Sequence, residues 1–597
     1  MNSTPPASSP SAAAIIHRVD IADANAHLFR VTLEVLRPAR ELRLSLPVWI
    51  PGSYMVREFA RHLSGLEARQ GGVRREVEAI DKTSWRVRCD GSAALLVSYH
   101  AYAFDASVRS AYLDARRGFF NGTSLLLRVE GQEAAPQRLA RGALPRGWTL
   151  ATSMRSAGRG GFEAADYDEL VDHPVMLGTF WRGAFEARGV PHEFVVEGAQ
   201  PGFDGERLLA DAKAICETQI AFWHGGRRKP PFERYVFMMN AVDDGYGGLE
   251  HRASTALIAA RRDLPRIGVG DASEGYLGLL GLVSHEYFHS WNVKRLKPRD
   301  LQRIDYTREN HTVLLWFFEG FTSYYDDLLL LRAGRIDAQR YLKLLAKALN
   351  GVLAAPGRFV QSVAQASFDA WTKYYRPDEN TPNATVNYYT KGALVALALD
   401  LSLRAEGRGT LDDVMRALWN ETDPAGQPAG GLDARPIDEA DIARALREVS
   451  GRAFDRELAA WVHGTDELPL EPLLARAGIA WGAEPATVAQ RLGLRVAESA
   501  LAGVTVKQVL RGGAAERAGL AAGDELLAAN GWRLRRLDDA IASSGGAGAA
   551  IELLIARDQR LLHLRVAADP AAAGSVSLSL AAPAAGAALT LRRGWLG

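Results

Sequence analysis

Hydrophobic and polar residues alternate through much of the first 180 positions, a pattern that is typical of half-buried strands. Residues 29–35 and 95–99 are two such runs, and turn-forming residues separate them from their neighbours. We therefore predict a β domain over residues 15–182. Residues 1–14 are rich in Ser, Pro and Ala, and we predict that they are disordered.

The pattern changes after residue 183, where strand-like runs such as 235–239 give way to helical spacing. Five apolar residues recur at that spacing around the segment 276–287, namely Tyr276, Leu279, Leu280, Val283 and Tyr287. Asp271, three residues before Glu274, is predicted to cap the helix that they form. We predict an α+β domain over residues 183–400 and a helical part over 401–480, with late helices at 412–419 and 437–449.

The predicted helix contains the sequence His-Glu-x-x-His, at His285, Glu286 and His289. Positions i and i+4 of an α-helix lie one above the other, so both imidazoles can bind one metal ion at about 2.0 to 2.1 Å. Glu286 lies one step round the helix, where it would act as the general base on water. With 13 histidines in the chain, the pentamer alone would arise by chance in about one chain in fifty. The other pair, His192-Glu193, has no second histidine and lies in a strand-like run.

A catalytic zinc site has three protein ligands and one open position, so a third, acidic ligand is expected. The candidate is Glu319, in the aromatic run 315–326, where a buried carboxylate needs a metal or another cation. The alternative, a glutamate at the exposed end of a core helix, stays open. Asp326 lies two turns further on the same face and would accept a proton from the non-ligating nitrogen of a bound histidine. This ligand set predicts one Zn²⁺ per chain in preference to manganese or cobalt.

Two runs in this region resemble the glycyl aminopeptidase family, gluzincin metallopeptidases that carry a C-terminal PDZ domain. They are His-Glu-Tyr-Phe-His-Ser-Trp-Asn-Val-Lys-Arg-Leu-Lys-Pro (285–298) and Leu-Trp-Phe-Phe-Glu-Gly-Phe-Thr-Ser-Tyr-Tyr (315–325). The 29 residues between His289 and Glu319 are typical of this family and exceed the spacing in the more distant aminopeptidase N family. The resemblance implies a thermolysin-like α+β catalytic domain and removal of small N-terminal residues such as Gly or Ala. Residues 46–54 also resemble the family, but they suggest no chemistry.

The segment 243–251 resembles the Gly-x-Met-Glu-Asn segment of aminopeptidase N. The resemblance implies that Gly247 and Gly248 let a peptide substrate pair as an extra strand, and that Glu250 binds its free α-ammonium group. Glycine-rich segments are also common as ordinary turns. The alternative that this segment is only a turn therefore stays open. His251 would either line the site or be a hydrogen-bonded structural histidine.

The segment 387–392, which opens another apolar helix, resembles the Tyr-x-Lys-Gly pattern of the same relatives. The resemblance implies that the Tyr389 phenol donates a hydrogen bond to the oxyanion of the tetrahedral intermediate. Tyr388 is the alternative if the register differs by one residue, and an ordinary packing role is a further alternative.

Residues 483–570 resemble a PDZ domain in the order of their elements. Leu492, Gly493 and Leu494 would form its carboxylate-binding loop, which can bind the C-terminus of a peptide beside a strand-addition groove. A domain retained for packing alone is the alternative. No role is predicted for the tail, residues 571–597.

Composition agrees with a large soluble enzyme of several domains, since 47% of the 597 residues are hydrophobic and 24% are charged. The net charge of +1 and the lack of a long basic run give no indication of a nucleic-acid partner. Cys89 and Cys216 have no metal-binding spacing. No run of 18 apolar residues and no signal peptide is seen, so a cytoplasmic location without a membrane span is expected. The sequence does not predict the oligomeric state.

Two classes of function follow. The first is a zinc aminopeptidase acting on peptides, with an endopeptidase as a variant of it. The second is a PDZ-bearing, peptide-binding scaffold whose peptidase domain is inactive. The intact set of His285, Glu286, His289 and Glu319 favours the enzyme, because an inactive domain has no physical need for a carboxylate in an aromatic helix.

Overall fold

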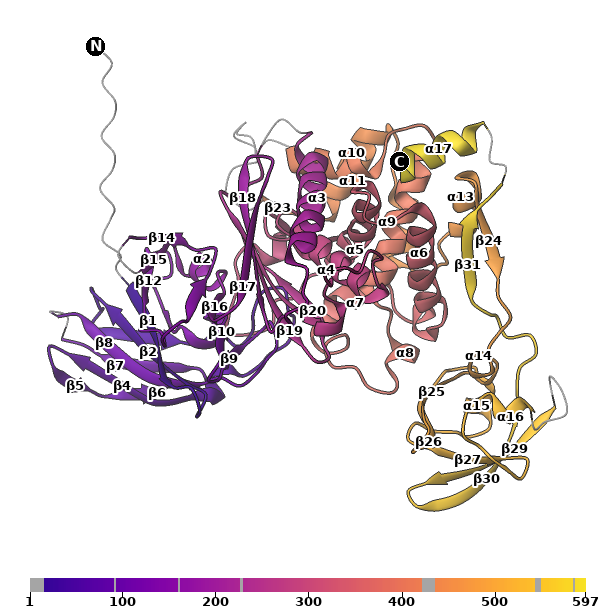
Figure 1. Ribbon diagram of the computed structural model, residues 1–597, viewed down its shortest axis with the longest axis horizontal. Helices are drawn as coiled ribbons and strands as arrows, with labels where there is room; N and C mark the ends of the chain where they lie inside the picture. Colours follow the sequence, from indigo (N-terminus) through magenta and orange to yellow (C-terminus); the bar gives the residue numbers. More distant parts are fainter. Residues whose placement is uncertain are drawn as a thin grey trace, which may run out of the picture. The chain divides into compact units, whose positions relative to one another are not determined.

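The computed structural model describes residues 15–90, 93–158, 161–225, 229–420, 435–542, 549–582 and 586–597. The chain forms two compact units, one of Met1–Asn310 with Thr422–Pro436 and one of His311–Glu421 with Ile437–Gly597. Figure 1 colours these segments along the sequence. The predicted disorder of residues 1–14 lies outside the described residues.

Three sheets make up the first part of the first unit, as the alternating pattern predicts. The largest has the order β14 (Arg155–Ser156), β15 (Gly161–Ala164), β12 (Gln137–Arg141), β1 (Ile15–Asp23), β2 (Leu28–Val35), β8 (Leu95–Tyr102), β4 (Leu63–Gln70) and β5 (Val73–Arg75). The second has the order β13 (Thr149–Ala151), β16 (Val175–Gly178), β10 (Arg117–Phe120) and β9 (Ala111–Leu113). The third has the order β11 (Arg128–Val129), β3 (Glu41–Ser45), β7 (Ser84–Arg88) and β6 (Val77–Ala79). Two short helices, α1 (Gly122–Leu125) and α2 (Tyr167–Val171), accompany the sheets.

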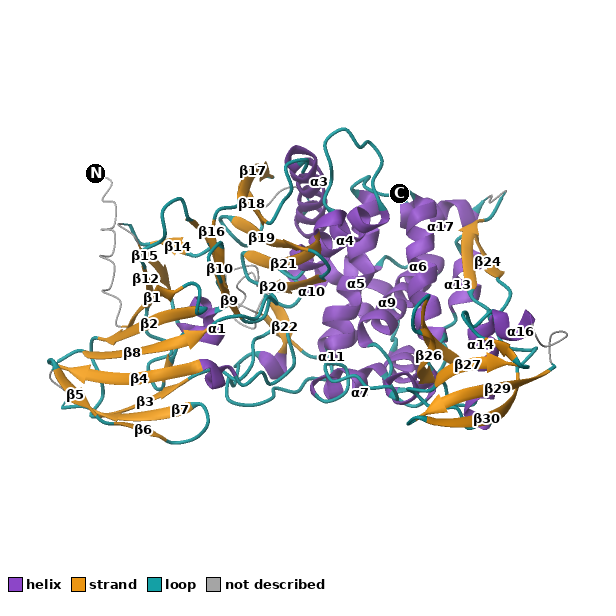
Figure 2. Cartoon of the chain, turned by 60° about the horizontal axis from the view of Figure 1, so that its bottom comes forward, coloured by secondary structure: helices purple, strands orange, loops and turns teal. Residues whose placement is uncertain are grey.

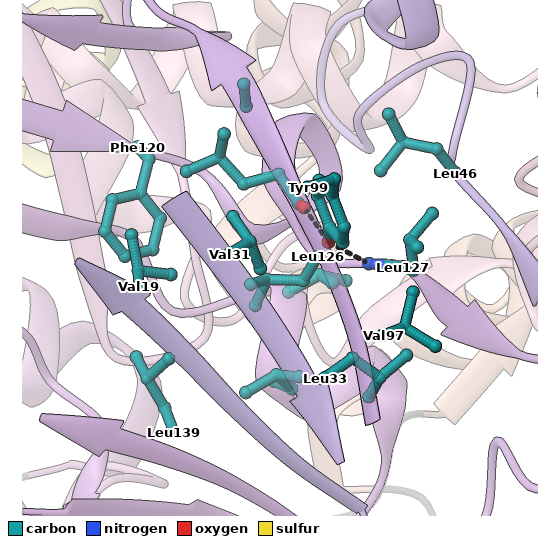
Figure 3. Packing of buried hydrophobic residues seen from close by; sticks show 14 of the residues in the cluster. Val19, Val31, Leu33, Leu46, Val97, Tyr99, Phe120, Leu126, Leu127 and Leu139 are labelled. Carbon is teal, nitrogen blue, oxygen red and sulfur yellow. Dashed lines mark hydrogen bonds between the residues drawn. The ribbon is translucent and has the colours of Figure 1, made fainter. Parts of the chain in front are cut away.

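Alternate residues of these strands form a common apolar core. Every second residue of β2 is buried, namely Phe29, Val31, Leu33 and Val35. Figure 3 shows the Tyr99 ring of β8 near Val31 and Leu33, and all of these residues belong to one buried cluster. Its hydroxyl donates a hydrogen bond to the Leu125 carbonyl (2.6 Å) and accepts one from the Leu127 amide (3.3 Å). The one polar atom of this ring is therefore satisfied inside the core.

A five-stranded sheet and two helices complete the first unit. The strand order is β17 (Trp181–Ala187), β18 (Val190–Glu197), β19 (Tyr235–Val242), β21 (Ser254–Ala260) and β20 (Tyr246–Glu250). β18, β19 and β21 are parallel, whereas β20 runs antiparallel to β21 at the edge of the sheet. Helix α3 (Gly205–His224) connects β18 to β19, and α4 (Glu274–Phe288) contacts both α3 and β20. Figure 2 shows α3 and α4 beside these strands.

Helix α4 carries the His-Glu-x-x-His sequence, as predicted, and the apolar residues at helical spacing are all buried. The predicted cap was wrong. Ser273 is the N-cap residue, and its side chain accepts a hydrogen bond from the Tyr276 amide (3.1 Å). Glu274 is therefore the first helical residue, and Asp271 lies outside the helix.

The second unit begins with helices. They are α5 (Leu315–Arg332), α6 (Ala338–Leu353), α7 (Val363–Phe368), α8 (Thr381–Ala384), α9 (Tyr388–Ala405), α10 (Leu411–Asn420), α11 (Glu439–Ser450), α12 (Asp455–Leu458) and α13 (Leu470–Arg476). Figure 1 shows α5 beside α9, and these two helices cross where Gly320 meets Gly392. Within the described ranges, no helix has both the length and the apolar character needed to cross a bilayer.

A strand-rich region is inserted into the second unit between two paired strands, β24 (Ile479–Ala483) and β31 (Val576–Leu580). It contains α14 (Val488–Leu492), β25 (Leu494–Ser499), β26 (Gly503–Val509), α15 (Ala514–Arg517), β27 (Glu525–Ala529), β28 (Trp532–Arg533), α16 (Asp539–Ala542), β29 (Ala550–Arg557) and β30 (Arg560–Ala567). Its sheet has the order β25-β26-β27-β29-β30, and it has an apolar core of its own.

The tail, for which the sequence predicted no role, ends in helix α17 (Ala587–Leu596). Trp595 is buried, and its indole nitrogen donates a hydrogen bond to the Tyr324 hydroxyl of α5 (3.0 Å). That hydroxyl donates in turn to the carboxylate of Asp400 on α9 (2.6 Å). The tail is thus part of the helical core of the second unit.

The glycine crossing of α5 and α9 gives the first testable prediction. A Cβ atom at Gly320 would lie 2.5 Å from the Gly392 Cα atom, so the helices would have to move apart. We expect Gly320→Ala to destabilise the protein by about 1 to 3 kcal/mol, measured as a lower Tm. Gly351 on α6 is the matched control, because no atom lies within 4 Å of its Cβ position. Gly351→Ala should stabilise by about 0.5 to 1 kcal/mol. An unchanged Tm for Gly320→Ala would contradict the close crossing.

Candidate active site

The two histidines of the motif lie at the C-terminal end of α4. His285 is in its last turn, and His289 is the C-cap residue, with helical backbone angles (φ −60°, ψ −18°). The Nδ1 atom of His289 lies 2.8 Å from the carbonyl oxygen of Asn292. A carbonyl can only accept, so Nδ1 carries the proton and Nε2 presents its lone pair.

The Nε2 atoms of His285 and His289 face each other at 3.1 Å. Two nitrogens bound tetrahedrally to one zinc ion at 2.0 to 2.1 Å would be about 3.3 Å apart. His289 is buried, whereas His285 is partly exposed. The donor atoms of this pair therefore fit a shared zinc ion in chemistry, orientation and spacing.

Glu286 lies on the same helix and packs against the edge strand β20. Its side chain is buried, and a Cβ atom at Gly248 would overlap its carboxylate. Glu250 ends β20 and is also buried. Glu250, Glu286 and His289 each bring one potential ligand atom into a group whose members lie within 4.8 Å of one another. The structure thus brings the predicted general base, the predicted amine-binding residue and one predicted metal ligand together.

The loop at residues 49–54, to which no chemistry was assigned, covers Glu250. Gly52 has a positive φ of 90°, and a Cβ atom there would lie 2.5 Å from either carboxylate oxygen of Glu250. A glycine in the left-handed region lets the backbone approach this carboxylate closely. The proline-glycine pair 51–52 marks a turn in the sequence but does not reveal what the turn approaches, because Glu250 is almost two hundred positions away.

His251 has a structural role and also lines a pocket beside Glu250, so both alternatives apply to it. Its Nδ1 atom lies 3.1 Å from the Asp172 carboxylate, and burial lowers the pKa of its imidazole. Lys294 binds the same carboxylate at 2.7 Å. Burial alone would raise the pKa of Asp172, but Lys294, His251 and Arg252 outweigh it and hold that pKa well below its usual range. His192, dismissed as a metal ligand, lies in β18 and is also structural, since its Nε2 atom is 2.8 Å from the Tyr287 hydroxyl.

The second unit holds Glu319 and Tyr389 on neighbouring helices. Glu319 is only 2% exposed, within the aromatic helix α5. Tyr389 is the second residue of α9, and the Asn387 side chain caps that helix by accepting from the Tyr389 amide (2.9 Å). Burial raises the pKa of Tyr389 well above its usual value, and the negative charge of Glu319 raises it further. The phenol therefore keeps its proton at neutral pH and can donate a hydrogen bond.

The structure bears on two further predictions, the choice between Tyr388 and Tyr389 and the histidine that Asp326 would bind. Tyr388, the alternative to Tyr389, is fully buried, whereas Tyr389 is partly exposed. Tyr389 is thus the more exposed residue of the two, and its role as the oxyanion donor stays a prediction. Asp326 is partly exposed on α5, and it was predicted to bind the non-ligating nitrogen of one of the two histidines. That nitrogen of His289 already faces Asn292. A role for Asp326 toward His285 stays a prediction.

Comparison with protein families matches residues 278–395 to M61 glycyl aminopeptidase, 17–179 to the peptidase M61 N-terminal domain and 484–556 to the PDZ domain. Among solved structures, an aminopeptidase N family protein from Idiomarina loihiensis is 36% identical, covers 98% of this chain and 100% of its own, and has a TM-score of 0.90. An M1 zinc metallopeptidase from Deinococcus radiodurans is 15% identical over 76% of this chain and 94% of its own, with a TM-score of 0.47. Comparison with curated proteins found no match.

The fold and the site together define a metallo-aminopeptidase. The chain belongs to the M61 glycyl aminopeptidase family. The predicted fold class, with its N-terminal β domain, helical catalytic part and C-terminal PDZ domain, is confirmed. The predicted boundaries at 182, 400 and 480 stay predictions, as does the carboxylate-binding role of Leu492, Gly493 and Leu494.

The close contact between β20 and α4 generates a second prediction. We expect Gly248→Ala to reduce hydrolysis of an alanine arylamide at least about tenfold, because the added methyl group must displace the Glu286 carboxylate. Gly270→Ala is the control, since Gly270 is exposed and has no atom within 4 Å of its Cβ position. Equal rates for the two variants, measured as kcat/KM, would show that Glu286 does not depend on this contact.

Proposed function

We propose that this protein is a zinc-dependent aminopeptidase that hydrolyses the N-terminal peptide bond of peptides and favours small residues, Gly or Ala. His285, His289 and Glu319 would bind one zinc ion per chain. The observation that carries the proposal is the pair of facing Nε2 atoms, 3.1 Å apart, with the proton of His289 held on its other nitrogen by Asn292. The preference for small residues is supported by membership of the glycyl aminopeptidase family.

The choice of Glu319 as the third ligand is supported by its surroundings. Its carboxylate is 2% exposed in a helix of aromatic residues, and burying an ionised carboxylate there costs several kcal/mol unless a cation compensates it. A zinc ion supplies that compensation, and a carboxylate is a common third ligand beside two histidines.

The chemistry assigns a separate task to each remaining residue. A bound zinc ion polarises the scissile carbonyl group and lowers the pKa of water toward about 7. Glu286 would take the proton of the attacking water and pass it to the departing amine, as general base and then general acid. Tyr389 would donate to the developing oxyanion, and its raised pKa keeps the required proton in place.

Glu250 would make the enzyme an aminopeptidase by binding the free α-ammonium of the substrate. It is buried within a few ångströms of Glu286 and His289, so an ammonium bound there lies next to the scissile carbonyl group. Gly247 and Gly248 belong to the edge strand β20, whose open side can pair with an extended peptide.

The PDZ domain would bind a peptide C-terminus. Gly493 has a positive φ of 71° and ends α14, and Leu494 begins β25. A tight turn that leads directly into an edge strand can direct backbone amides at a terminal carboxylate.

Paired substitutions separate the proposed base from the proposed ligand. We expect Glu286→Gln to retain one zinc per chain but to lose at least about 10³-fold in kcat, because only proton transfer is removed. Glu319→Gln should lose both zinc and activity, because a neutral amide is a poor zinc ligand. Metal content by elemental analysis and kcat on alanine arylamide measure the two effects. Full activity of Glu286→Gln, or a full zinc content of Glu319→Gln, would contradict the corresponding assignment.

Blocking the substrate amine tests the role of Glu250. The protein should hydrolyse glycine and alanine arylamides but not their N-acetylated forms, because acetylation removes the charge that Glu250 binds. Glu250→Gln should raise KM for the free amines by about tenfold or more and leave zinc content unchanged. Equal cleavage of the acetylated substrates would indicate an endopeptidase, and no cleavage of either by zinc-loaded protein would favour the inactive scaffold.

A further inference from the structure

A pocket lies beside Glu250 in the first unit. Its walls are the loop at residues 49–54, the end of α2, the residues that follow β20 and the segment after α4. Glu250 lines one part of it, and Lys294 and Lys297 line another.

Three cations follow the His-Glu-x-x-His motif, and the fold itself satisfies two of them. The Lys294 ammonium binds the Asp172 carboxylate at 2.7 Å. The Arg295 guanidinium donates to three backbone carbonyl oxygens, those of Arg252 (3.0 Å), Ser290 (2.7 Å) and Pro231 (2.5 Å). Lys297 differs, since its ammonium makes no hydrogen bond or ion pair with any residue in the described part of the chain.

The two aspartates beside this pocket are already engaged. Asp172 is held by Lys294, His251 and Arg252. Asp168 accepts a hydrogen bond from the Tyr306 hydroxyl (2.9 Å).

Lys297 is therefore a partly buried cation that forms no ion pair with a carboxylate of the described residues. Burial lowers the pKa of Lys297 to about 8, and the nearby charges of Arg252 and Lys294 add to that effect, whereas the charges of Asp172 and Asp168 oppose it. Buried charges in proteins are usually paired directly, so an ammonium without an ion pair in a pocket wall favours an anionic ligand.

The same pocket also contacts the proposed amine-binding residue. The Glu250 carboxylate both lines the pocket and belongs to the group that brings Glu286 and His289 within 4.8 Å. The α-ammonium and the side chain of an N-terminal residue branch from one carbon atom. A residue whose ammonium is bound by Glu250, with its carbonyl group next to Glu286, therefore has its side chain within reach of this pocket.

We propose that this pocket receives the side chain of the substrate's N-terminal residue and that Lys297 binds a carboxylate there. N-terminal Asp and Glu are then accepted in preference to Asn and Gln. The inference rests on the proposed function, because it requires Glu250 to hold the α-ammonium. Glycine and alanine leave the pocket to water, so their cleavage is compatible with it.

The test compares arylamides of Glu and Gln, and of Asp and Asn, which differ only in side-chain charge. We expect a Glu-to-Gln ratio of kcat/KM of at least about ten, because a charge-assisted hydrogen bond to a partly buried lysine is lost with the amide. Lys297→Met should bring the ratio to about one, and Lys297→Arg should restore most of it. The exposed Lys347 on α6 provides the control, since Lys347→Met removes the same charge far from the pocket in sequence and should keep the wild-type ratio.

The measured quantity is the ratio of kcat/KM for the Glu and Gln arylamides, so a change in overall activity does not affect it. The wild-type protein alone is sufficient to refute the inference. A wild-type ratio near one, with alanine arylamide still cleaved, would overturn the inference and leave the proposed function intact. No cleavage of any arylamide would count against the proposed function itself. The dipeptide Ala-Ala and its C-terminal amide provide a further comparison. If the wild-type protein prefers Ala-Ala and Lys297→Met abolishes that preference, Lys297 binds the C-terminal carboxylate of the substrate. That result would overturn the assignment to the side chain.

Discussion

The first unit buries two carboxylates close together, and the need to compensate their negative charge determines how the site is built. Glu250 and Glu286 are each 5% exposed, and both approach His289. Two carboxylates so close together repel each other and are poorly solvated, so each gains from a cation. The proposed reaction supplies two cations, a zinc ion at the histidines and the substrate ammonium at Glu250. A substrate without a free amine would bring no cation to Glu250, which is a physical reason for an aminopeptidase rather than an endopeptidase.

Glycines make this concentration of charge geometrically feasible. Gly248 lets an edge strand contact the Glu286 carboxylate, and Gly52, with its left-handed backbone, lets a loop of the β domain contact Glu250. The pair Gly320 and Gly392 does the same for α5 and α9, which carry Glu319 and Tyr389. In each case a missing side chain allows the backbone to approach closely.

The local chemistry could be predicted from the sequence, whereas contacts between distant segments could not. The spacing of His285 and His289 and the helical burial around them follow from 3.6 residues per turn. Capping depends on backbone angles that a pattern does not contain, which is why Asp271 was chosen instead of Ser273. The approach of Gly52 to Glu250 joins segments almost 200 residues apart, and its signal in the sequence is only a proline-glycine turn. Lys297 was part of a recognised motif. Only the structure shows that Lys294 and Arg295 bind other groups of the protein and that Lys297 forms no ion pair with the described residues.

The chain leaves the helices of the second unit to form the PDZ region, and the C-terminal tail returns to those helices. β24 and β31 pair with each other, so the chain leaves for the PDZ region and returns at the same place. After the return, Trp595 donates to Tyr324, which donates to Asp400. Asp400 is fully buried, and Arg404 compensates its charge at 2.9 Å. A buried charge of this kind requires each of its partners, so the tail completes the helical core that carries Glu319 rather than extending the PDZ region.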